Sequence, residues 1–295
     1  MGQCSDWLSV IIGPTGVGKT DYALRRAKEW GCPIVNCDSR QIYRELPVGT
    51  AAPTQDELAQ AKHYFVGTHS LTDDYNAGQY ERDAVKLLKE LMHNHSGDRP
   101  FAILTGGSML YMNAVLQGLD NLPSIPPDIR TAVQNEYKTN GLQWLQEEVQ
   151  RIDPVYWNEV DRQNPQRLMH CIEITRTARI PYSALRTRAA IQRPWRTHIV
   201  RLVRPREELY RRINMRVEQM IANGLEEETR CAYLPFIEQG LPLPNSLRTV
   251  GYNEMIDYIE GRCTRQEAID KIKQHTRNYA KRQMTWYRNS MSFTF

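Results

Sequence analysis

Short apolar runs alternate with amphipathic segments along the first part of the chain. Residues 7–12, 33–38 and 100–105 are apolar-rich runs of strand length, as expected for strands buried on both faces of a sheet. Residues 20–30 and 79–95 instead carry apolar side chains at the spacing of one helix face. Because strands and helices alternate, the pattern predicts an α/β fold with a parallel sheet flanked by helices.

The pattern changes after Leu119. Residues 122–127 are rich in proline and predict a linker. From there to residue 193 only amphipathic helical segments follow, with many arginines, and residues 198–202 then have the pattern of a strand that returns to the sheet. The sequence therefore predicts a core domain interrupted by a helical insertion. The core is made of residues 1–120 and 196–295, and the insertion of residues 121–195.

The last part of the chain is predicted to be mostly helical. Residues 207–223 and 265–287 have helical periodicity. Residues 235–244 contain prolines and a glycine and are expected to form a loop, and residues 246–252 a glycine-containing turn. The final helix is predicted to carry one basic face, formed by Lys273, Arg277, Lys281 and Arg288.

Composition narrows the class of protein. The chain is 41% hydrophobic and 24% charged, as in folded soluble domains, and no apolar run has the length of a membrane-spanning helix. Its six cysteines are scattered without C-x-x-C pairs, which indicates reduced thiols and disfavours a zinc site. We therefore expect a cytoplasmic protein with no membrane partner. The net charge of +4 is too small to indicate a nucleic-acid partner by itself.

The first apolar run leads directly into G-P-T-G-V-G-K-T at residues 13–20, which matches the G-x-x-x-x-G-K-[ST] pattern of a phosphate-binding loop. In such a loop the backbone N–H groups and the N-terminus of the following helix favour a bound phosphate. Lys19 adds a full positive charge, and the hydroxyl of Thr20 can bind a magnesium ion shared with the phosphates. The loop predicts a bound diphosphate or triphosphate without saying which bond breaks.

A second candidate group, Asp38, ends the second predicted strand. Ligands of open α/β sheets bind beyond the carboxyl ends of the strands, so Asp38 and the loop should face one crevice. Most nucleotide-hydrolysing proteins with this loop carry a carboxylate after a later strand, but residues 100–105 run into Gly106-Gly107-Ser108. Asp38 can instead take a proton from an acceptor that faces the phosphates. The combination indicates group transfer from a phosphorylated donor, either by a small-molecule kinase or by a transferase with pyrophosphate as leaving group.

Several longer blocks make a resemblance to one family specific. They are residues 13–20, 38–43, 49–51, 106–111, 164–167, 251–252 and 276–286. In this order, and over nearly the whole chain, they resemble the tRNA dimethylallyltransferases in their shorter bacterial form. The resemblance implies a P-loop NTPase-like parallel sheet with an inserted all-helical domain that contacts tRNA. It also implies transfer of a dimethylallyl group from its diphosphate to N6 of the adenine on the 3′ side of the anticodon.

The resemblance further implies roles for individual residues. The expected catalytic set is Asp38, Ser108, Lys19, Thr20 and Arg212. The diphosphate is expected to bind Gly13, Pro14, Thr15, Gly16, Val17, Gly18, Lys19 and Thr20, with Mg²⁺ as cofactor at the Thr20 hydroxyl. Asp38 is expected to act as the base on the adenine amine, and the Ser108 hydroxyl to form a hydrogen bond beside it.

The expected partners are dimethylallyl diphosphate and the anticodon stem-loop of tRNA. Contacts with tRNA are expected at Asp38, Ser39, Arg40, Gln41, Ser108, Arg130, Gln166, Arg167, Arg248, Gly251, Tyr252, Lys281, Arg282, Gln283, Trp286 and Arg288. The target base must turn out of the stacked loop before its amine can reach the donor. We expect the chain to act as a monomer.

Two other enzymes remain open at this point. A small-molecule or nucleoside kinase would use the same loop and base, but it would not need the arginine-rich insertion or the basic last helix. An enzyme that transfers the prenyl group to free adenine nucleotides would share the chemistry and be indifferent to tRNA. A non-enzymatic RNA-binding module would leave Lys19 and Asp38 without a task.

Overall fold

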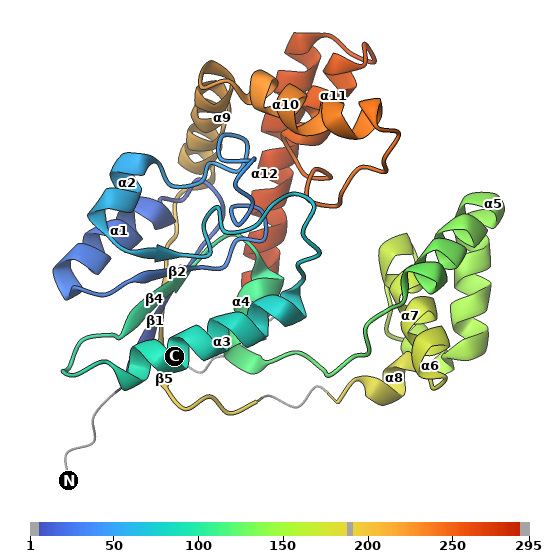
Figure 1. The fold of residues 1–295 in the computed structure, drawn as a ribbon, viewed down its shortest axis with the longest axis horizontal. Coiled ribbons are helices and arrows are strands. Elements are labelled where there is room, and N and C mark those ends of the chain that lie inside the picture. The colour runs from blue at the N-terminus through green and yellow to red at the C-terminus, as the bar shows by residue number, and fades with distance from the viewer. Residues whose placement is uncertain (1–5, 188–190, 290–295) are drawn as a thin grey trace. The chain divides into compact units, whose positions relative to one another are not determined.

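The structure is a computed structural model that describes residues 6–187 and 191–289. Its sheet has five parallel strands in the order β3-β2-β4-β1-β5 (Figure 1). The strands are β1 (Trp7–Ile12), β2 (Ile34–Asn36), β3 (His63–Tyr64), β4 (Ala102–Thr105) and β5 (Arg196–Arg201). The parallel sheet predicted from the sequence is confirmed.

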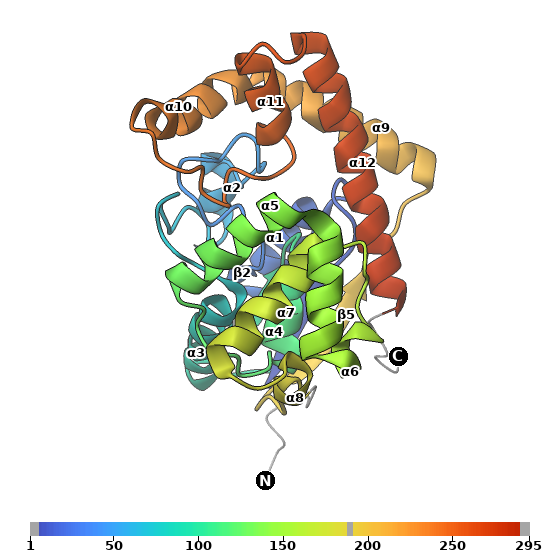
Figure 2. The same cartoon turned by 90° about the vertical axis from the view of Figure 1, so that its right-hand side faces the viewer.

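Helices complete the same unit. Those of its first half are α1 (Lys19–Trp30), α2 (Gln55–Gln60), α3 (Ala77–His93) and α4 (Met109–Gln117). Those after β5 are α9 (Arg206–Ala222), α10 (Leu225–Glu238), α11 (Tyr252–Ile259) and α12 (Arg265–Asn289). The long helix α12 packs against both α9 and α11 (Figures 1 and 2). No helix in the described part of the chain combines the length and apolar composition needed to span a membrane.

The central strands are buried on both faces, which explains their continuous apolar sequences. Val10 of β1 lies opposite Leu104 of β4, and both side chains are fully buried against α3 and α4. The neighbouring side chains Ile11 and Ile103 point to the other face and pack against α1. This burial fixes the register of the sheet and thereby the place where each strand ends.

The structure differs from the predicted local structure in two places. The sequence predicts a loop from residue 235, but α10 runs through Pro235 because Ala232 and Tyr233 are buried on one of its faces. The predicted turn is present up to Gly251, but the helix α11 that begins at Tyr252 is not among the predicted elements. Strand β3 ends at Tyr64, because the next residue, Phe65, has a left-handed φ of 61°.

Residues Gln117–Ile191 form a second compact unit, and their described part is helical. The helices are α5 (Pro127–Ile152), α6 (Pro154–Trp157), α7 (Pro165–Ala178) and α8 (Tyr182–Leu185). Three of the four, α5, α6 and α7, start with proline, whose fixed φ suits the first helical position. The unit has its own core, in which Leu145 and Val149 of α5 pack with Leu168 and Ile172 of α7.

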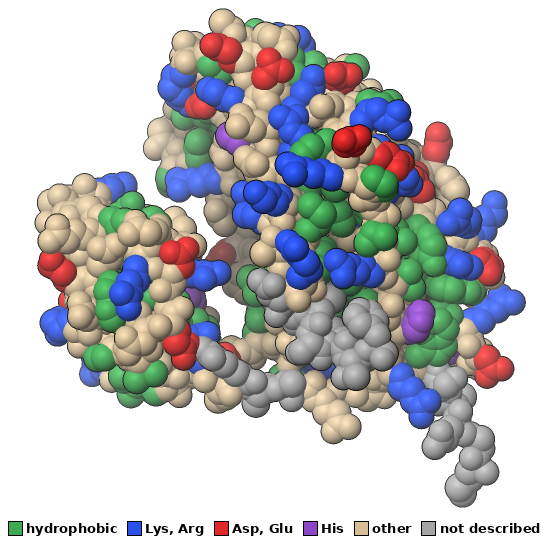
Figure 3. All heavy atoms as spheres, turned by 180° about the vertical axis from the view of Figure 1, so that it is seen from behind, with side chains coloured by type: hydrophobic (Ala, Val, Ile, Leu, Met, Phe, Trp, Pro, Cys, Tyr) green, Lys and Arg blue, Asp and Glu red, His purple; other side chains and the backbone are tan. Residues whose placement is uncertain are grey.

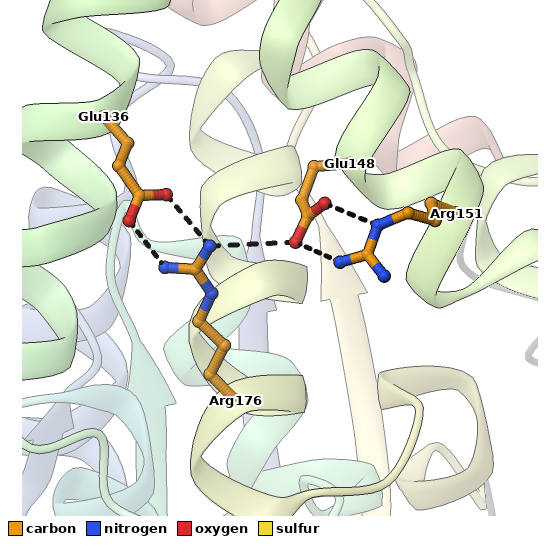
Figure 4. A network of polar contacts seen from close by, with 4 residues as sticks. All are labelled: Glu136, Glu148, Arg151 and Arg176. Atoms are coloured by element: carbon orange, nitrogen blue, oxygen red, sulfur yellow. Dashed lines mark hydrogen bonds and ion pairs between the residues drawn. The ribbon is translucent and has the colours of Figure 1, made fainter.

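An ion-pair network holds the shape of this second unit. Helix α5 is broken at Gly141, where φ is 74° and ψ is −169°. Arg176 of α7 donates two hydrogen bonds to Glu136, which precedes the break, at 2.9 and 3.0 Å (Figure 4). It also lies 3.7 Å from Glu148, which comes after the break and is paired with Arg151. One guanidinium thus links the two halves of α5.

Candidate active site

The carboxyl ends of three neighbouring strands bring the predicted catalytic groups to one edge of the sheet. Strand β1 continues into the phosphate loop, β2 into Asp38, and β4 into Gly106-Gly107-Ser108. The pairing of β2 with β4 extends one step further, because the N–H of Cys37 donates to the carbonyl of Thr105 at 2.8 Å. β4 ends without a carboxylate, and the Thr105 hydroxyl donates to the Ile11 carbonyl. Asp38 is therefore the acidic side chain that directly follows one of these three strands.

The phosphate loop takes a conformation that depends on its glycines. Gly16 and Gly18 have φ of 80° and 102°, in the left-handed region that other residues rarely adopt. A Cβ atom on Gly16 would lie 2.9 Å from Cγ1 of Ile213, so the close packing also requires glycine. Gly18 directly precedes α1, whose first N–H groups have no partner within the helix. An anion at this helix N-terminus is stabilised by those donors.

Two arginines hold the loop by its carbonyl groups. Arg212 of α9 donates its Nε–H to the carbonyl of Gly16 at 2.8 Å, and Arg204 donates its Nε–H to the carbonyl of Val17 at 2.8 Å. A trans peptide sets its N–H opposite its carbonyl, so the N–H of Gly18 points away from Arg204. The family resemblance places Arg212 in the expected catalytic set, either binding the diphosphate or ordering the reactive complex. The structure gives it the additional task of shaping the loop, and it shows the same task for Arg204, which the sequence analysis missed.

Lys19 lies at the opening of the loop. Its Nζ donates to the carbonyls of Gly13 at 2.7 Å and Pro14 at 3.1 Å. The pKa of Lys19 is lowered from 10.5 to about 8, mainly by burial and also by the nearby charge of Arg216, while Asp38 acts in the opposite direction. The ammonium group of Lys19 is therefore poorly solvated. An anionic ligand bound beside it would stabilise its charge.

The carboxylate of Asp38 is oriented by backbone groups. Its Oδ1 accepts hydrogen bonds from the N–H groups of Arg40 at 2.9 Å and Gln41 at 3.4 Å. Its Oδ2 lies over Gly107, where a Cβ atom would come within 2.5 Å of it. Within the described residues, no hydrogen bond to Oδ2 is seen. Oδ2 is therefore the oxygen that remains to accept a proton.

Ser108 joins the ends of β2 and β4. Its Oγ accepts a hydrogen bond from the N–H of Ser39 at 2.8 Å and also bonds to the Ser39 hydroxyl at 2.8 Å. Its N–H donates to the carbonyl of Cys37 at 3.3 Å. The hydroxyl thus lies beside the segment that carries Asp38, where a substrate amine near Asp38 would also be within its reach.

Gln283 of α12 connects the phosphate loop to the glycine turn after β4. Its Oε1 accepts the N–H of Thr15 at 2.8 Å, and its Nε2 donates to the carbonyl of Gly107 at 2.8 Å. Tyr279, one turn earlier, donates its hydroxyl to the same Gly107 carbonyl at 2.7 Å. The sequence predicts Gln283 as a tRNA contact, but its side chain is fully buried and both of its polar atoms are bonded to protein groups. Its role in this structure is to position the two loops.

Arg216 belongs to the site, although the sequence analysis assigns it no role. It lies one turn after Arg212 on α9, and its charge interacts with both Lys19 and Asp38. One nitrogen, Nη2, lies 3.4 Å from the carbonyls of Thr50 and of Ala51. These contacts are long, and the described residues provide no other hydrogen bond to the guanidinium. The spacing of four residues from Arg212 is the sequence signal that could have identified it.

Two further residues predicted as tRNA contacts have structural roles here. Tyr252 is fully buried and donates its hydroxyl to Glu228 at 2.5 Å. Gly251 has a left-handed φ of 102°, and its N–H donates to Glu254 at 2.7 Å. Neither group lies on the surface in this structure, because the turn that carries them is packed into the core beneath α11.

The other predicted tRNA contacts are mostly exposed. In the core unit the exposed ones are Arg248, Lys281, Arg282 and Arg288, while Ser39, Arg40, Gln41 and Trp286 are half-buried. In the second unit Arg130, Gln166 and Arg167 are exposed on α5 and α7. Each is therefore at, or partly at, the surface of its own unit.

A band of basic side chains lies over α12 on the face shown in Figure 3. The predicted basic face of this helix is divided. Lys273 pairs with Glu218 of α9 at 2.9 Å, and Arg277 donates to Asn214 of α9 at 2.7 Å. These two side chains attach α12 to α9. The exposed charges of the second half of the helix, at residues 281, 282 and 288, remain available to a polyanion.

Comparison with known proteins identifies the family. A family model described as IPP transferase matches residues 41–290, which is most of the chain. The chain belongs to this family. It is 46% identical to tRNA dimethylallyltransferase 2 of Parabacteroides distasonis, with 98% of this chain and 93% of the relative covered. It is also 46% identical to tRNA dimethylallyltransferase 1 of Phocaeicola vulgatus, with 96% and 91% covered.

Solved structures agree with this assignment. The chain matches the full-length tRNA isopentenylpyrophosphate transferase of Bacillus halodurans with a TM-score of 0.66 and 31% identity, covering 97% of this chain and 87% of that one. A eukaryotic dimethylallyltransferase acting on tRNA matches with a TM-score of 0.77, covering 96% and 70%. Its identity of 20% supports the fold alone. The fold predicted from the sequence is confirmed.

Proposed function

We propose that this protein transfers a dimethylallyl group from dimethylallyl diphosphate to N6 of the adenine on the 3′ side of the anticodon in tRNA. The observation that carries the proposal is the meeting of three groups at one sheet edge: the phosphate loop, Asp38 and the Gly106–Ser108 turn. Gln283 joins the first and third of these directly. The named activities of the family's relatives supply the substrate class.

The diphosphate of the donor binds in the phosphate loop. As the allylic C–O bond breaks, both electrons of that bond leave with the diphosphate, whose negative charge grows. Lys19 and Arg216 supply positive charge beside the loop, and the N–H groups at the start of α1 supply further donors. Because Arg204 and Arg212 fix the loop from outside, these donors need little reorganisation during the reaction.

The acceptor side of the reaction is assigned to Asp38 and Ser108. An exocyclic adenine amine is a weak nucleophile, and its nitrogen would become positively charged on bonding to the allylic carbon. It must therefore lose a proton as the new bond forms. The Oδ2 atom of Asp38 takes that proton, while Oδ1 stays bonded to the backbone. The Ser108 hydroxyl holds the amine in place by a hydrogen bond. The products are the prenylated adenine, diphosphate and a proton on Asp38.

Magnesium fits the chain at Thr20. The Thr20 side chain is exposed at the start of α1, beside the phosphate loop, and Mg²⁺ is commonly held by few protein groups together with substrate phosphates. No cluster of three or more His, Cys, Asp or Glu side chains that could hold a metal ion is found among the described residues. When bound, the ion would neutralise charge on the leaving diphosphate.

We propose that residues of each unit contact the tRNA. We assign the phosphate contacts to the exposed basic residues of α12 and to those of the inserted unit, residues 117–191. We further propose that the protein acts as a monomer. Because the proposed substrate is tRNA, we propose that the protein acts in the cytoplasm.

The proposal is tested by offering one donor to several acceptors. The protein is incubated with radiolabelled dimethylallyl diphosphate and Mg²⁺, together with unmodified tRNA, with AMP, or with ATP and no acceptor. We expect label on tRNA alone. Label only on AMP would make the protein a prenyltransferase of free nucleotides. Consumption of ATP without prenyl transfer would make it a kinase or a nucleotidase, and either result would refute the proposal.

A further inference from the structure

A carboxylate outside the sheet edge holds a loop that faces the site. Glu228 of α10 accepts the N–H of Val48 at 2.7 Å and the N–H of Gly49 at 2.8 Å, one on each oxygen. The Tyr252 hydroxyl donates to the same carboxylate at 2.5 Å. Three donors therefore converge on one side chain that does not itself touch Asp38 or the phosphate loop.

The loop, Tyr252 and Leu225 are tightly packed around the Glu228 carboxylate. A Cβ atom on Gly49 would lie 2.5 Å from the hydroxyl oxygen of Tyr252 and 2.7 Å from Cδ1 of Leu225. Tyr252 is fully buried, and its ring packs within the same core cluster as Leu225. The loop beginning at Val48 is thus fixed both by charge-assisted hydrogen bonds and by contact.

The far side of this loop presents two carbonyl groups to the active site. The Nε2 of Gln41 donates to Thr50 O at 3.2 Å and to Ala51 O at 3.0 Å. Arg216 approaches the same two oxygens at 3.4 Å. Ala51 has a φ of 46°, which is strained for a residue with a Cβ atom and persists only where its surroundings enforce it.

Both of these residues act on the reacting groups, Gln41 by contact and Arg216 through its charge. Gln41 also donates its backbone N–H to Asp38, and the charge of Arg216 acts on Lys19. We propose that Glu228 and Tyr252 are positioning residues, which fix the loop Val48–Ala51 so that its carbonyls aim Arg216 at the diphosphate and hold Gln41 against Asp38. This inference rests on the proposed function for the identity of the diphosphate ligand.

Binding of inorganic pyrophosphate, measured by titration calorimetry with Mg²⁺ present, tests the inference without turnover. Glu228→Gln keeps the shape but sets an NH₂ group against one backbone N–H. Losing that hydrogen bond should weaken pyrophosphate binding about tenfold. Glu227→Gln removes the same charge from the exposed neighbouring position and should leave binding unchanged. A role limited to stability would lower the melting temperature of Glu228→Gln and leave the affinity of the folded protein as it is.

A double-mutant cycle with Arg216→Met gives the decisive result. If Glu228 acts through Arg216, adding Glu228→Gln to Arg216→Met should cost less than about twofold in pyrophosphate affinity. A full tenfold cost in both backgrounds would overturn the inference. If Glu228→Gln does not fold, Tyr252→Phe takes its place in the same cycle. This change keeps the ring and removes the hydroxyl, with its short hydrogen bond to Glu228 and its longer one to the Leu46 carbonyl. The expected cost is about threefold.

The two proposals fail in different ways. The first outcome is that the wild-type protein binds pyrophosphate and the double-mutant cycle shows the coupling, but tRNA is not prenylated. This would refute the proposed function and leave the positioning role standing. The second outcome is that the protein prenylates tRNA, but neither Glu228→Gln nor Tyr252→Phe changes its pyrophosphate affinity. This would refute the positioning role alone.

Discussion

Replacing Gln283 by leucine separates a positioning role from RNA contact. Leucine fills a similar volume and cannot form hydrogen bonds, so the change removes the link between the N–H of Thr15 and the carbonyl of Gly107. The carbonyl keeps its bond from Tyr279 at 2.7 Å. The Thr15 N–H is left without its acceptor. The consequence should therefore fall on the phosphate loop.

The size of the effect can be worked out from these contacts. An unsatisfied buried donor costs about 1–3 kcal/mol, and the lower half of that range applies because Thr15 is only partly buried. For a chain of this size about 1.5 kcal/mol corresponds to a fall of roughly 3–6 °C in melting temperature. If the misplaced loop loses a similar amount of binding energy, pyrophosphate affinity falls about tenfold. The affinity for tRNA should stay unchanged because Gln283 is fully buried.

Thermal unfolding, calorimetric titration with pyrophosphate and a gel-shift titration with tRNA measure the three quantities. Gln274→Leu is the matched control, since Gln274 lies on the same helix and is exposed. The reasoning is refuted if Gln283→Leu weakens tRNA binding while pyrophosphate binding stays at the wild-type value. That result would make Gln283 an RNA contact, as its sequence context suggests.

Three further predictions concern single residues. Asp38→Ala should lower single-turnover transfer by about a hundredfold or more while a gel shift shows unchanged tRNA binding; loss of tRNA binding instead would mean that Asp38 is not the base. Burial places the pKa of Lys19 at about 8, so its charge is lost as pH rises through 8 and pyrophosphate affinity should fall there. The Lys19→Arg variant stays charged over this range and controls for titration of pyrophosphate itself. If pyrophosphate affinity has the same pH dependence in both proteins, the fall is not due to Lys19. Gly141→Ala should cost about 1–3 kcal/mol in thermal unfolding, because φ of 74° with ψ of −169° is open almost only to glycine; equal stability would mean that α5 can straighten.

Much of the core can be predicted because it depends on local signals. Continuous apolar runs identify β1, β2 and β4, and the phosphate-loop motif predicts both the turn after β1 and the start of α1. The strand ends then place Asp38 beside the loop by topology alone. The same reasoning places Ser108 after β4. These inferences need only the order of the elements and the rule that parallel strands end at one edge.

The remaining contacts depend on tertiary packing that no local pattern reveals. Arg204 and Arg216 resemble other arginines in the sequence. Only the packing of α9 and of the segment just before it against the phosphate loop brings them into the site. Gln283 belongs to a basic helix, which favours an RNA contact, but it is on the helix face that turns inward. Pro235 shows the same limit for secondary structure, since burial of one helix face outweighs a residue that usually ends helices.

The central claim is that the phosphate loop holds a leaving diphosphate whose allylic group passes to a tRNA adenine near Asp38. The most direct measurement monitors pyrophosphate release and prenyl incorporation in the same reaction, with dimethylallyl diphosphate, Mg²⁺ and unmodified tRNA. We predict one pyrophosphate for each prenyl group on tRNA, no release without tRNA, and no phosphate released from added ATP. Pyrophosphate release that does not depend on tRNA, or hydrolysis of ATP in its place, would contradict the account.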